Sequence, residues 1–212
     1  MKESIDLYKY ENEYLSQGYK YIAGTDEAGR GPLAGDVFCA AVILDPKVKI
    51  DGLNDSKKLT EQMRDKLYIE IKEKALSYKV IRISHKTIDE INILEASRLG
   101  MEKAIKGLSI KPNFILTDYM DLYKTDIKYL KLAHGDALSA SIAAASILAK
   151  VERDKYMDEM DKLYPLYHFK ENKGYPTKSH IEALKQYGIS DIHRRSYKPV
   201  KDILYRQLEL DL

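Results

Sequence analysis

The sequence has one cysteine, no tryptophan and no apolar stretch long enough to cross a membrane. Cys39 has no partner, so the chain can form neither an internal disulfide nor a cysteine-rich metal site. The longest apolar run, 37–44, has eight residues, and the stretch 142–149 is apolar except for Ser146, whereas a membrane span needs about 20. The first residues, MKESIDLYKYENEY, lack the apolar core of a signal peptide. These absences predict a protein of a reducing cytoplasm with no membrane partner.

The charge balance is close to neutral, with 35 basic and 33 acidic residues and a formal net charge of +2. A hydrophobic fraction of 44% and a charged fraction of 32% are typical of a globular chain with one sizeable core, and they exclude a disordered or collagen-like one. The basic residues gather near the end, because residues 164–201 hold 8 Lys or Arg against 3 acids. This basic patch predicts sequence-independent contacts with nucleic-acid phosphates, and a solvated charged surface is the open alternative. The candidates for phosphate contact are Lys170, Lys173, Lys178, Arg194, Arg195 and Lys198.

The apolar pattern predicts strands that alternate with helices. Strands are expected at 20–25, 37–44, 79–84 and 113–117, followed by a loop and a short strand within 121–132. Helices are expected within 1–18, over 58–76 after a start at 54–56, over 87–106, and from 136 to about 163. This order indicates an α/β layer structure around a mixed sheet. It divides the chain into an N-terminal polar, helical extension (1–18), an α/β body (19–163) and a basic C-terminal helical segment (164–212) packed on the same domain.

Four acidic residues lie where a predicted strand ends or a helix begins: Asp26, Glu27, Asp118 and Asp136. Functional groups of open α/β sheets gather beyond the carboxyl ends of the strands. Neighbouring residues of a regular strand point to opposite faces, so Asp26 and Glu27 can share one site only if the strand breaks at Glu27. The following AGRG is expected to supply that break. Asp136 is expected to cap the long helix or to lie in its first turn.

These four carboxylates predict an oxygen-only site, in which like charges repel one another. A divalent cation removes the repulsion, and oxygen ligands favour Mg²⁺ or Mn²⁺ over zinc. Two such ions about 3.5–4 Å apart would clamp a phosphodiester, activate water on one side and stabilise the leaving oxygen on the other. Each acid taken singly is also explained by ordinary capping of a strand end or a helix.

Five blocks of the sequence resemble, in order, the motifs of the ribonuclease HII family, the prokaryotic type 2 ribonucleases H. The first is GTDEAGRGPLAG at 24–35, and NDSKKL at 54–59 follows it. AAASILAKVERD at 143–154 resembles the long catalytic helix, and HFKENKGYPTKSH at 168–180 and IHRRSYKPV at 192–200 resemble the C-terminal signatures. Together the blocks span nearly the whole chain, from about 20 to 200.

The resemblance implies a ribonuclease H-like fold, with a central five-stranded mixed sheet flanked by helices and a C-terminal helical segment. It implies that Asp26, Glu27, Asp118 and Asp136 are catalytic and hold two Mg²⁺ or Mn²⁺ ions when substrate is bound, with Asp26 and Asp118 as the shared ligands. The implied activity is hydrolysis of the RNA strand of RNA–DNA hybrids and incision 5′ of single ribonucleotides in duplex DNA. The products would carry 5′-phosphate and 3′-hydroxyl ends.

The resemblance also assigns contacts with the substrate. The residues assigned to the ribose 2′-hydroxyl, through their backbone groups, are Gly29, Arg30 and Gly31. That hydroxyl separates RNA from DNA, and the two glycines let the main chain approach it closely. Tyr175 would pack on the same sugar, and Lys57 would lie near the phosphate backbone or the scissile bond.

The long helix carries three further candidates for contact with DNA phosphate: Ser146, Lys150 and Arg153. His134 and His168 are assigned no catalytic role, because a lone histidine is more often structural. The chain departs from the family pattern at Tyr119, which stands where the family often has glycine, and at His134, where lysine is more usual. The first departure predicts a different loop after Asp118, and the second an altered local charge.

Each alternative assignment of function is tested by one feature of the sequence. Only about 18 residues precede the first strand, which disfavours the type 3 enzymes with their long N-terminal domain. The last residues, 207–212, lack the aromatic pair of a sliding-clamp peptide, and a monomer without a clamp motif is expected.

A hybrid-binding module that has lost catalysis is disfavoured by the presence of all four acids. A DNase or DNA strand-transfer enzyme of the same fold remains an alternative, which the ribose-directed loop disfavours. The 28–35 loop lacks the glycine spacing of a nucleotide cradle.

Overall fold

The computed structural model describes residues 6–210, with side chains up to Tyr205 in the last helix. Five strands form one sheet in the order β3-β2-β1-β4-β5. Their bounds are Ile22–Ala28 (β1), Val37–Ile43 (β2), Ser77–Ile83 (β3), Phe114–Asp118 (β4) and Tyr129–Leu132 (β5). β1 to β3 pair in antiparallel fashion, whereas β4 runs parallel to both β1 and β5. This confirms the predicted five-stranded mixed sheet.

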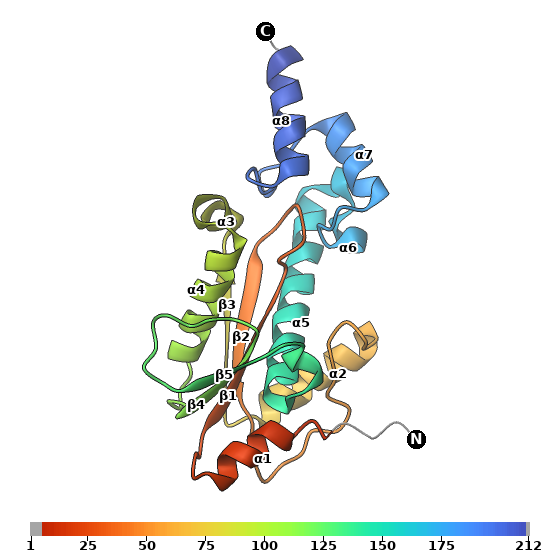
Figure 1. The fold of residues 1–212 in the computed structure, drawn as a ribbon. Coiled ribbons are helices and arrows are strands. Elements are labelled where there is room, and N and C mark those ends of the chain that lie inside the picture. Colours follow the sequence, from red (N-terminus) through yellow and green to blue (C-terminus); the bar gives the residue numbers. More distant parts are fainter. Residues whose placement is uncertain (1–5, 211–212) are drawn as a thin grey trace.

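Helices cover both faces of this sheet (Figure 1). α2 (Glu61–Lys74) and α5 (Ala140–Leu163) pack on one face, and α3 (His85–Ile91) and α4 (Ile93–Lys106) pack on the other. Every residue of β2 is therefore buried, which accounts for its unbroken apolar sequence. α5 lies close against β1 because residue 24 is glycine. A Cβ atom at Gly24 would lie 2.1 Å from the carbonyl carbon of Ser141.

Several helix boundaries differ from the predicted ones because of specific capping side chains. α2 begins at Glu61 rather than near residue 58, since the Thr60 hydroxyl accepts a hydrogen bond from the Met63 amide. The helix expected over 87–106 is two helices, α3 and α4. They are divided at Asn92, whose φ is 66° and whose side chain caps the first turn of α4.

The start of α5 also corrects a prediction. Ser139 caps this helix through the Ile142 amide, and Asp136 lies before it in the short 3-10 helix η1 (Gly135–Ala137). α1 (Lys9–Ser16) braces the same end of α5. The buried Glu11 carboxylate accepts hydrogen bonds from the Ser139 hydroxyl at 2.6 Å and the Ser141 amide at 2.8 Å. The expected cap at Asp136 is therefore wrong, and the real cap is three residues later.

The C-terminal segment lies at the end of α5 remote from α1 (Figure 1). It comprises η2 (Pro165–Tyr167), α6 (Phe169–Asn172), α7 (Lys178–Tyr187) and α8 (Lys198–Leu210). It is tied to the 33–35 loop by backbone hydrogen bonds from Leu33 to Gly174 and from Gly35 to Ile192. Within residues 6–210, no helix is both long and apolar enough to cross a membrane.

Candidate active site

Two acids lie side by side at the carboxyl ends of neighbouring parallel strands. Thr25 of β1 is in register with Thr117 of β4, so Asp26 and Asp118 follow at the same edge of the sheet. The Asp118 carboxylate accepts a hydrogen bond of 2.7 Å from the Gly135 amide. That bond attaches η1, and with it Asp136, to the end of β4.

Glu27 reaches the same edge without the predicted break in the strand. β1 continues to Ala28, where Asp26 is paired with Ala40 and Glu27 with Cys39. The expected break at Glu27 is therefore wrong, and the two acids leave the strand on opposite faces. Burial is nevertheless the main cause of a raised pKa in both acids, and the charge of Asp118 adds to it in each case.

Burial and mutual repulsion make these carboxyl groups hard to ionise. Burial, followed by the charges of Glu27 and Asp118, raises the pKa of Asp26 well above its usual range, while hydrogen bonds from the Glu27 amide and the Ser146 hydroxyl act in the opposite direction. Burial raises the pKa of Glu27 to about 7, against the opposing charge of Arg30. Burial, followed by the charge of Asp55, raises the pKa of Asp136. The nearby charges of Arg30 and Lys57 therefore do not offset the effects of burial and repulsion on these acids.

The oxygens at this edge suit a hard divalent cation by their chemistry, although their positions do not form a three-ligand group within the described residues. The Oε2 atom of Glu27 is buried and has no hydrogen-bond partner in the described chain. Within residues 6–210, no three acid, histidine or cysteine side chains converge on one ion position. Lys57 supplies one counter-charge, with its Nζ atom 4.0 Å from Asp136 Oδ2. An unpartnered carboxylate oxygen among repelling acids is the kind of group that Mg²⁺ or Mn²⁺ coordinates.

The 54–59 loop brings a second group of predicted residues to this edge. Lys57 is exposed beside Asp136, as its predicted role near a phosphate requires. Ser146 is buried, and its hydroxyl lies 2.9 Å from that of Ser56. Its contact with substrate stays a prediction. Lys150 bonds to Asp154 on the same helix. Asp55, which the sequence reasoning missed, lies close enough to Asp136 to influence its pKa.

The Gly29–Gly31 loop follows β1 directly. Gly29 has a φ of 107°, and a Cβ atom there would lie 2.2 Å from Arg153 Nε. Only glycine fits this position. A Cβ atom at Gly31 would lie 3.4 Å from the ring of Tyr175, which is 41% exposed. The structure thus brings the loop and Tyr175 together beside the acids.

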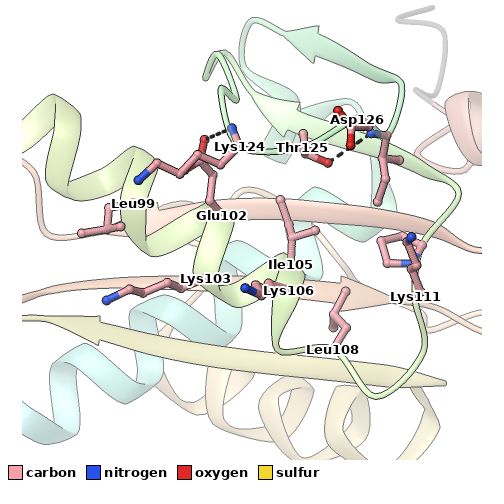
Figure 2. A pocket seen from close by; sticks show the side chains of 12 residues that line it. Leu99, Glu102, Lys103, Ile105, Lys106, Leu108, Lys111, Lys124, Thr125 and Asp126 are labelled. Carbon is pink, nitrogen blue, oxygen red and sulfur yellow. Dashed lines mark hydrogen bonds between the residues drawn. The ribbon is translucent and has the colours of Figure 1, made fainter.

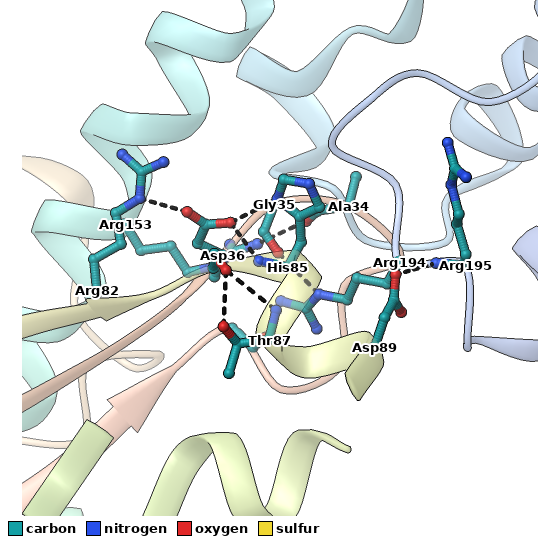
Figure 3. A network of polar contacts seen from close by, with 12 residues as sticks. Ala34, Gly35, Asp36, Arg82, His85, Thr87, Asp89, Arg153, Arg194 and Arg195 are labelled. Atoms are coloured by element: carbon teal, nitrogen blue, oxygen red, sulfur yellow. Dashed lines mark hydrogen bonds and ion pairs between the residues drawn. The ribbon is translucent and has the colours of Figure 1, made fainter. Parts of the chain in front are cut away.

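Two buried arginines, Arg194 and Arg153, donate hydrogen bonds to the main chain of this loop and of the segments beside it (Figure 3). Arg194 donates to the carbonyl oxygens of Gly29 at 2.6 Å, Arg30 at 3.0 Å and Gly35 at 2.9 Å. Arg153 donates to the carbonyl oxygen of Lys173 at 3.0 Å, and more weakly to those of residues 34 and 36. These side chains are 0% and 1% exposed. The prediction that Arg194 and Arg153 contact phosphate is therefore wrong, and they brace the main chain instead.

A buried carboxylate fixes the far end of the loop. Asp36 is fully buried, bonds to the Arg82 guanidinium, and accepts hydrogen bonds from the His85 amide at 2.7 Å and from His85 Nδ1 at 2.9 Å (Figure 3). Asp89 of α3 similarly accepts a bond from the Arg195 amide. The sequence reasoning missed Asp36 and Asp89, because nothing in a single sequence distinguishes a buried carboxylate from an exposed one.

The other basic candidates of the C-terminal segment remain available to phosphate. Lys170, Lys178, Arg195 and Lys198 are exposed. Lys173 forms an ion pair with Asp158. These positions leave their predicted phosphate contacts open.

A separate cavity of about 550 Å³ lies between α4 and the 124–127 loop (Figure 2). Its lining includes Leu99, Glu102, Lys106, Lys111, Lys124 and Asp126. It contains none of the predicted site residues. The acidic edge and the cavity are therefore distinct places on the molecule.

The sheet order, the carboxylates at adjacent strand ends and the helix packed behind them define a hydrolase of the ribonuclease H type. The sequence profile described as "Ribonuclease HII" matches residues 23–200. This chain belongs to the ribonuclease HII family.

Individual comparisons agree with that membership. The chain is 52% identical over 198 residues to a Desulfitobacterium hafniense protein named Ribonuclease HII, covering 93% of this chain and 76% of that one. It is 51% identical over 201 residues to an Acholeplasma laidlawii protein of the same name, covering 95% and 98%. Among solved structures, the ribonuclease H2 of Pyrococcus horikoshii matches with a TM-score of 0.75 and 30% identity, over 88% of this chain and 98% of that one.

Proposed function

We propose that this ribonuclease, whose family membership supports action on RNA–DNA hybrids, also incises duplex DNA on the 5′ side of a single embedded ribonucleotide. Water would attack the phosphorus in line, the bond from phosphorus to the upstream O3′ would break, and 5′-phosphate and 3′-hydroxyl ends would result. The observation that carries the proposal is the position of the Gly29–Gly31 loop. The loop begins immediately after the last residue of β1, directly beside Asp26 and Glu27.

The four acids are the proposed catalytic residues. Asp26 and Asp118 would be the shared ligands of two Mg²⁺ or Mn²⁺ ions, and Glu27 and Asp136 would complete the two sets. The raised pKa of Asp26 and the unpartnered Oε2 atom of Glu27 support this assignment. When bound, the cations supply the charge that lowers the pKa of water and stabilises the leaving oxygen. Lys57 would face the same phosphate from the solvent side.

The proposed ribose sensor is the backbone of the Gly29–Gly31 loop. Arg194 occupies the carbonyl oxygens of Gly29 and Arg30. The N–H groups of Arg30 and Gly31 donate to no acceptor within residues 6–210, so they remain free for a 2′-hydroxyl oxygen. Tyr175, half-exposed against Gly31, would pack on the sugar that carries this hydroxyl. A deoxyribose lacks the oxygen that these donors would bind.

The deciding experiment uses a labelled DNA duplex with one ribonucleotide and an all-deoxy control, each with Mg²⁺, Mn²⁺ or EDTA. We expect cation-dependent incision 5′ of the ribonucleotide, with the control intact. Cleavage of both duplexes would replace the proposal with a DNase. Tight binding of a hybrid without any cleavage would replace it with a binding module.

The proposal extends to the setting of the reaction. A monomer of one α/β domain, with residues 164–212 packed on the body, would act on nucleic acid in the cytoplasm. The prediction of no sliding-clamp motif falls on residues 207–212, whose side chains lie outside the described part of the chain. Size-exclusion chromatography with light scattering tests the monomer.

A further inference from the structure

The turn after Asp118 forces one residue into an unfavourable backbone conformation. Tyr119 has a φ of 49°, and its amide donates to the Thr117 carbonyl oxygen at 3.0 Å. The Thr117 hydroxyl donates to the Met120 carbonyl oxygen at 2.8 Å. Thr117 and Met120 are both buried. Because its neighbours are anchored in the core, the main chain at Tyr119 must turn outward in the left-handed region.

This turn accounts for the left-handed backbone conformation at residue 119, but it does not account for the presence of a tyrosine there. A left-handed conformation is unfavourable for a bulky side chain and free of strain for glycine. The Tyr119 side chain is 70% exposed and belongs to no hydrophobic cluster of the described chain. Its ring has one neighbour of note, the Lys131 ammonium 5.5 Å from the ring centroid. Strained residues that gain nothing from packing are concentrated at functional sites.

The position of the Tyr119 side chain indicates what it does. It directly follows Asp118, at the carboxyl end of β4, and Lys131 of β5 is in register with Thr117. An exposed aromatic ring and an ammonium group therefore stand together beside the acidic edge. Aromatic rings pack on sugars and bases, and ammonium groups bind phosphates. The Lys131 ion pair with Asp121, at 2.7 Å, is solvent-exposed and so is readily exchanged for a phosphate.

We propose that Tyr119 and Lys131 form a substrate-contact site, in which the ring packs on a sugar of the bound nucleic acid near the scissile phosphate and the ammonium group binds the adjoining phosphate. This inference rests on the proposed function, since it takes an RNA–DNA hybrid as the ligand. Tyr119 contributes affinity, and it takes no part in proton transfer or cation binding.

The test compares Tyr119→Gly with the wild type in steady-state cleavage of an RNA–DNA hybrid and in anisotropy-based binding of the same hybrid in Ca²⁺. Loss of one ring contact should raise KM and Kd about fivefold or more, with kcat within about twofold of the wild type. The melting temperature should stay equal or rise, because glycine removes the left-handed strain. Tyr119→Phe keeps the ring and should restore wild-type affinity. Lys131→Met should reduce the slope of log Kd against log salt by about 0.9.

Tyr123→Gly is the matched control from the same loop. Tyr123 is 69% exposed, but its ring lies 4.0 Å from the Arg98 guanidinium of α4. Its loss should lower the melting temperature and leave KM unchanged. An unchanged Kd for Tyr119→Gly, or a fall in kcat alone, would overturn the inference and assign Tyr119 a structural effect on Asp118. A wild-type protein that neither binds nor cuts the hybrid would overturn the proposed function together with this inference.

Discussion

Replacing Glu27 by glutamine should stabilise the cation-free protein at alkaline pH. The Glu27 side chain is 8% exposed and its Oε2 atom has no hydrogen-bond partner within the described chain. Burial raises its pKa from 4.5 to about 7, with Asp118 adding to the rise. Ionisation of this group in the folded protein is therefore costly, and the glutamine variant avoids that cost.

The direction in which pH changes the free energy of unfolding follows from the pKa of Glu27 in the folded and unfolded chains. Below pH 4.5 the group is protonated in both the folded and the unfolded chain, and its contribution to stability is fully present. Between pH 4.5 and 7 the folded state holds more protons than the unfolded one, so the free energy of unfolding falls as pH rises. Above pH 7 the loss is complete. At 1.36 kcal/mol per pKa unit, the loss amounts to about 3 kcal/mol, or about 6–12 °C in Tm for a chain of this size.

Urea unfolding in EDTA at pH 5 and pH 8.5 measures this effect. The stability difference between Glu27→Gln and the wild type should be about 2–3 kcal/mol larger at pH 8.5 than at pH 5. Glu73→Gln, an exposed change on α2, is the control and should show no such dependence. Mg²⁺ at pH 8.5 should stabilise the wild type more than the variant. A difference that is the same at both pH values, or a less stable variant at pH 8.5, would refute the reasoning.

Three further predictions concern catalysis and the Gly29–Gly31 loop. Asp118→Asn should cut turnover by about 10³-fold or more through loss of the charge of a proposed cation ligand, with circular dichroism and hybrid binding nearly unchanged. Undiminished turnover in single-turnover assays would contradict this prediction. Tyr175→Ala should impair incision at isolated ribonucleotides more than cleavage of long hybrids, and an equal loss on both substrates would instead favour a packing role. Arg194→Lys should destabilise the protein by about 3 kcal/mol, because lysine cannot satisfy the three carbonyl oxygens. The same variant should cleave ribonucleotide-containing duplex in preference to all-deoxy duplex by a smaller ratio than the wild type. A ratio equal to that of the wild type would contradict the role of Arg194 in shaping the loop.

The sheet, and the adjacency of Asp26 and Asp118 at one edge of it, can be predicted from the sequence for a physical reason. An apolar run that ends in an acid predicts a strand and the approximate position of its carboxyl end, although β1 continues two residues past Asp26, and parallel neighbouring strands bring such ends together. The position of Asp136 is less predictable, since a serine and an aspartate are both good helix caps. The choice of Ser139 depends on Glu11, which is more than 120 residues away.

The buried arginines show where sequence patterns give the wrong answer. Arg194 stands in a basic stretch beside Arg195, yet one is buried and the other exposed. Their charge and spacing are the same, and the difference lies in carbonyl oxygens from residues 29–35. A pattern along one segment carries no information about acceptors from another, so a phosphate contact was the expected and incorrect result.

The brace between Arg194 and Gly29 has a consequence for the order in which the enzyme is completed. The two residues are 165 positions apart, so the bond between them closes almost the whole chain. During synthesis β1 and its acids are made early, whereas the group that shapes the adjoining loop is made near the end. Long-range closures of this kind form late in folding. The nascent chain thus carries Asp26 and Glu27 well before the loop beside them can take its final form, and the proposed selectivity for ribose would be acquired only after Arg194 has been added.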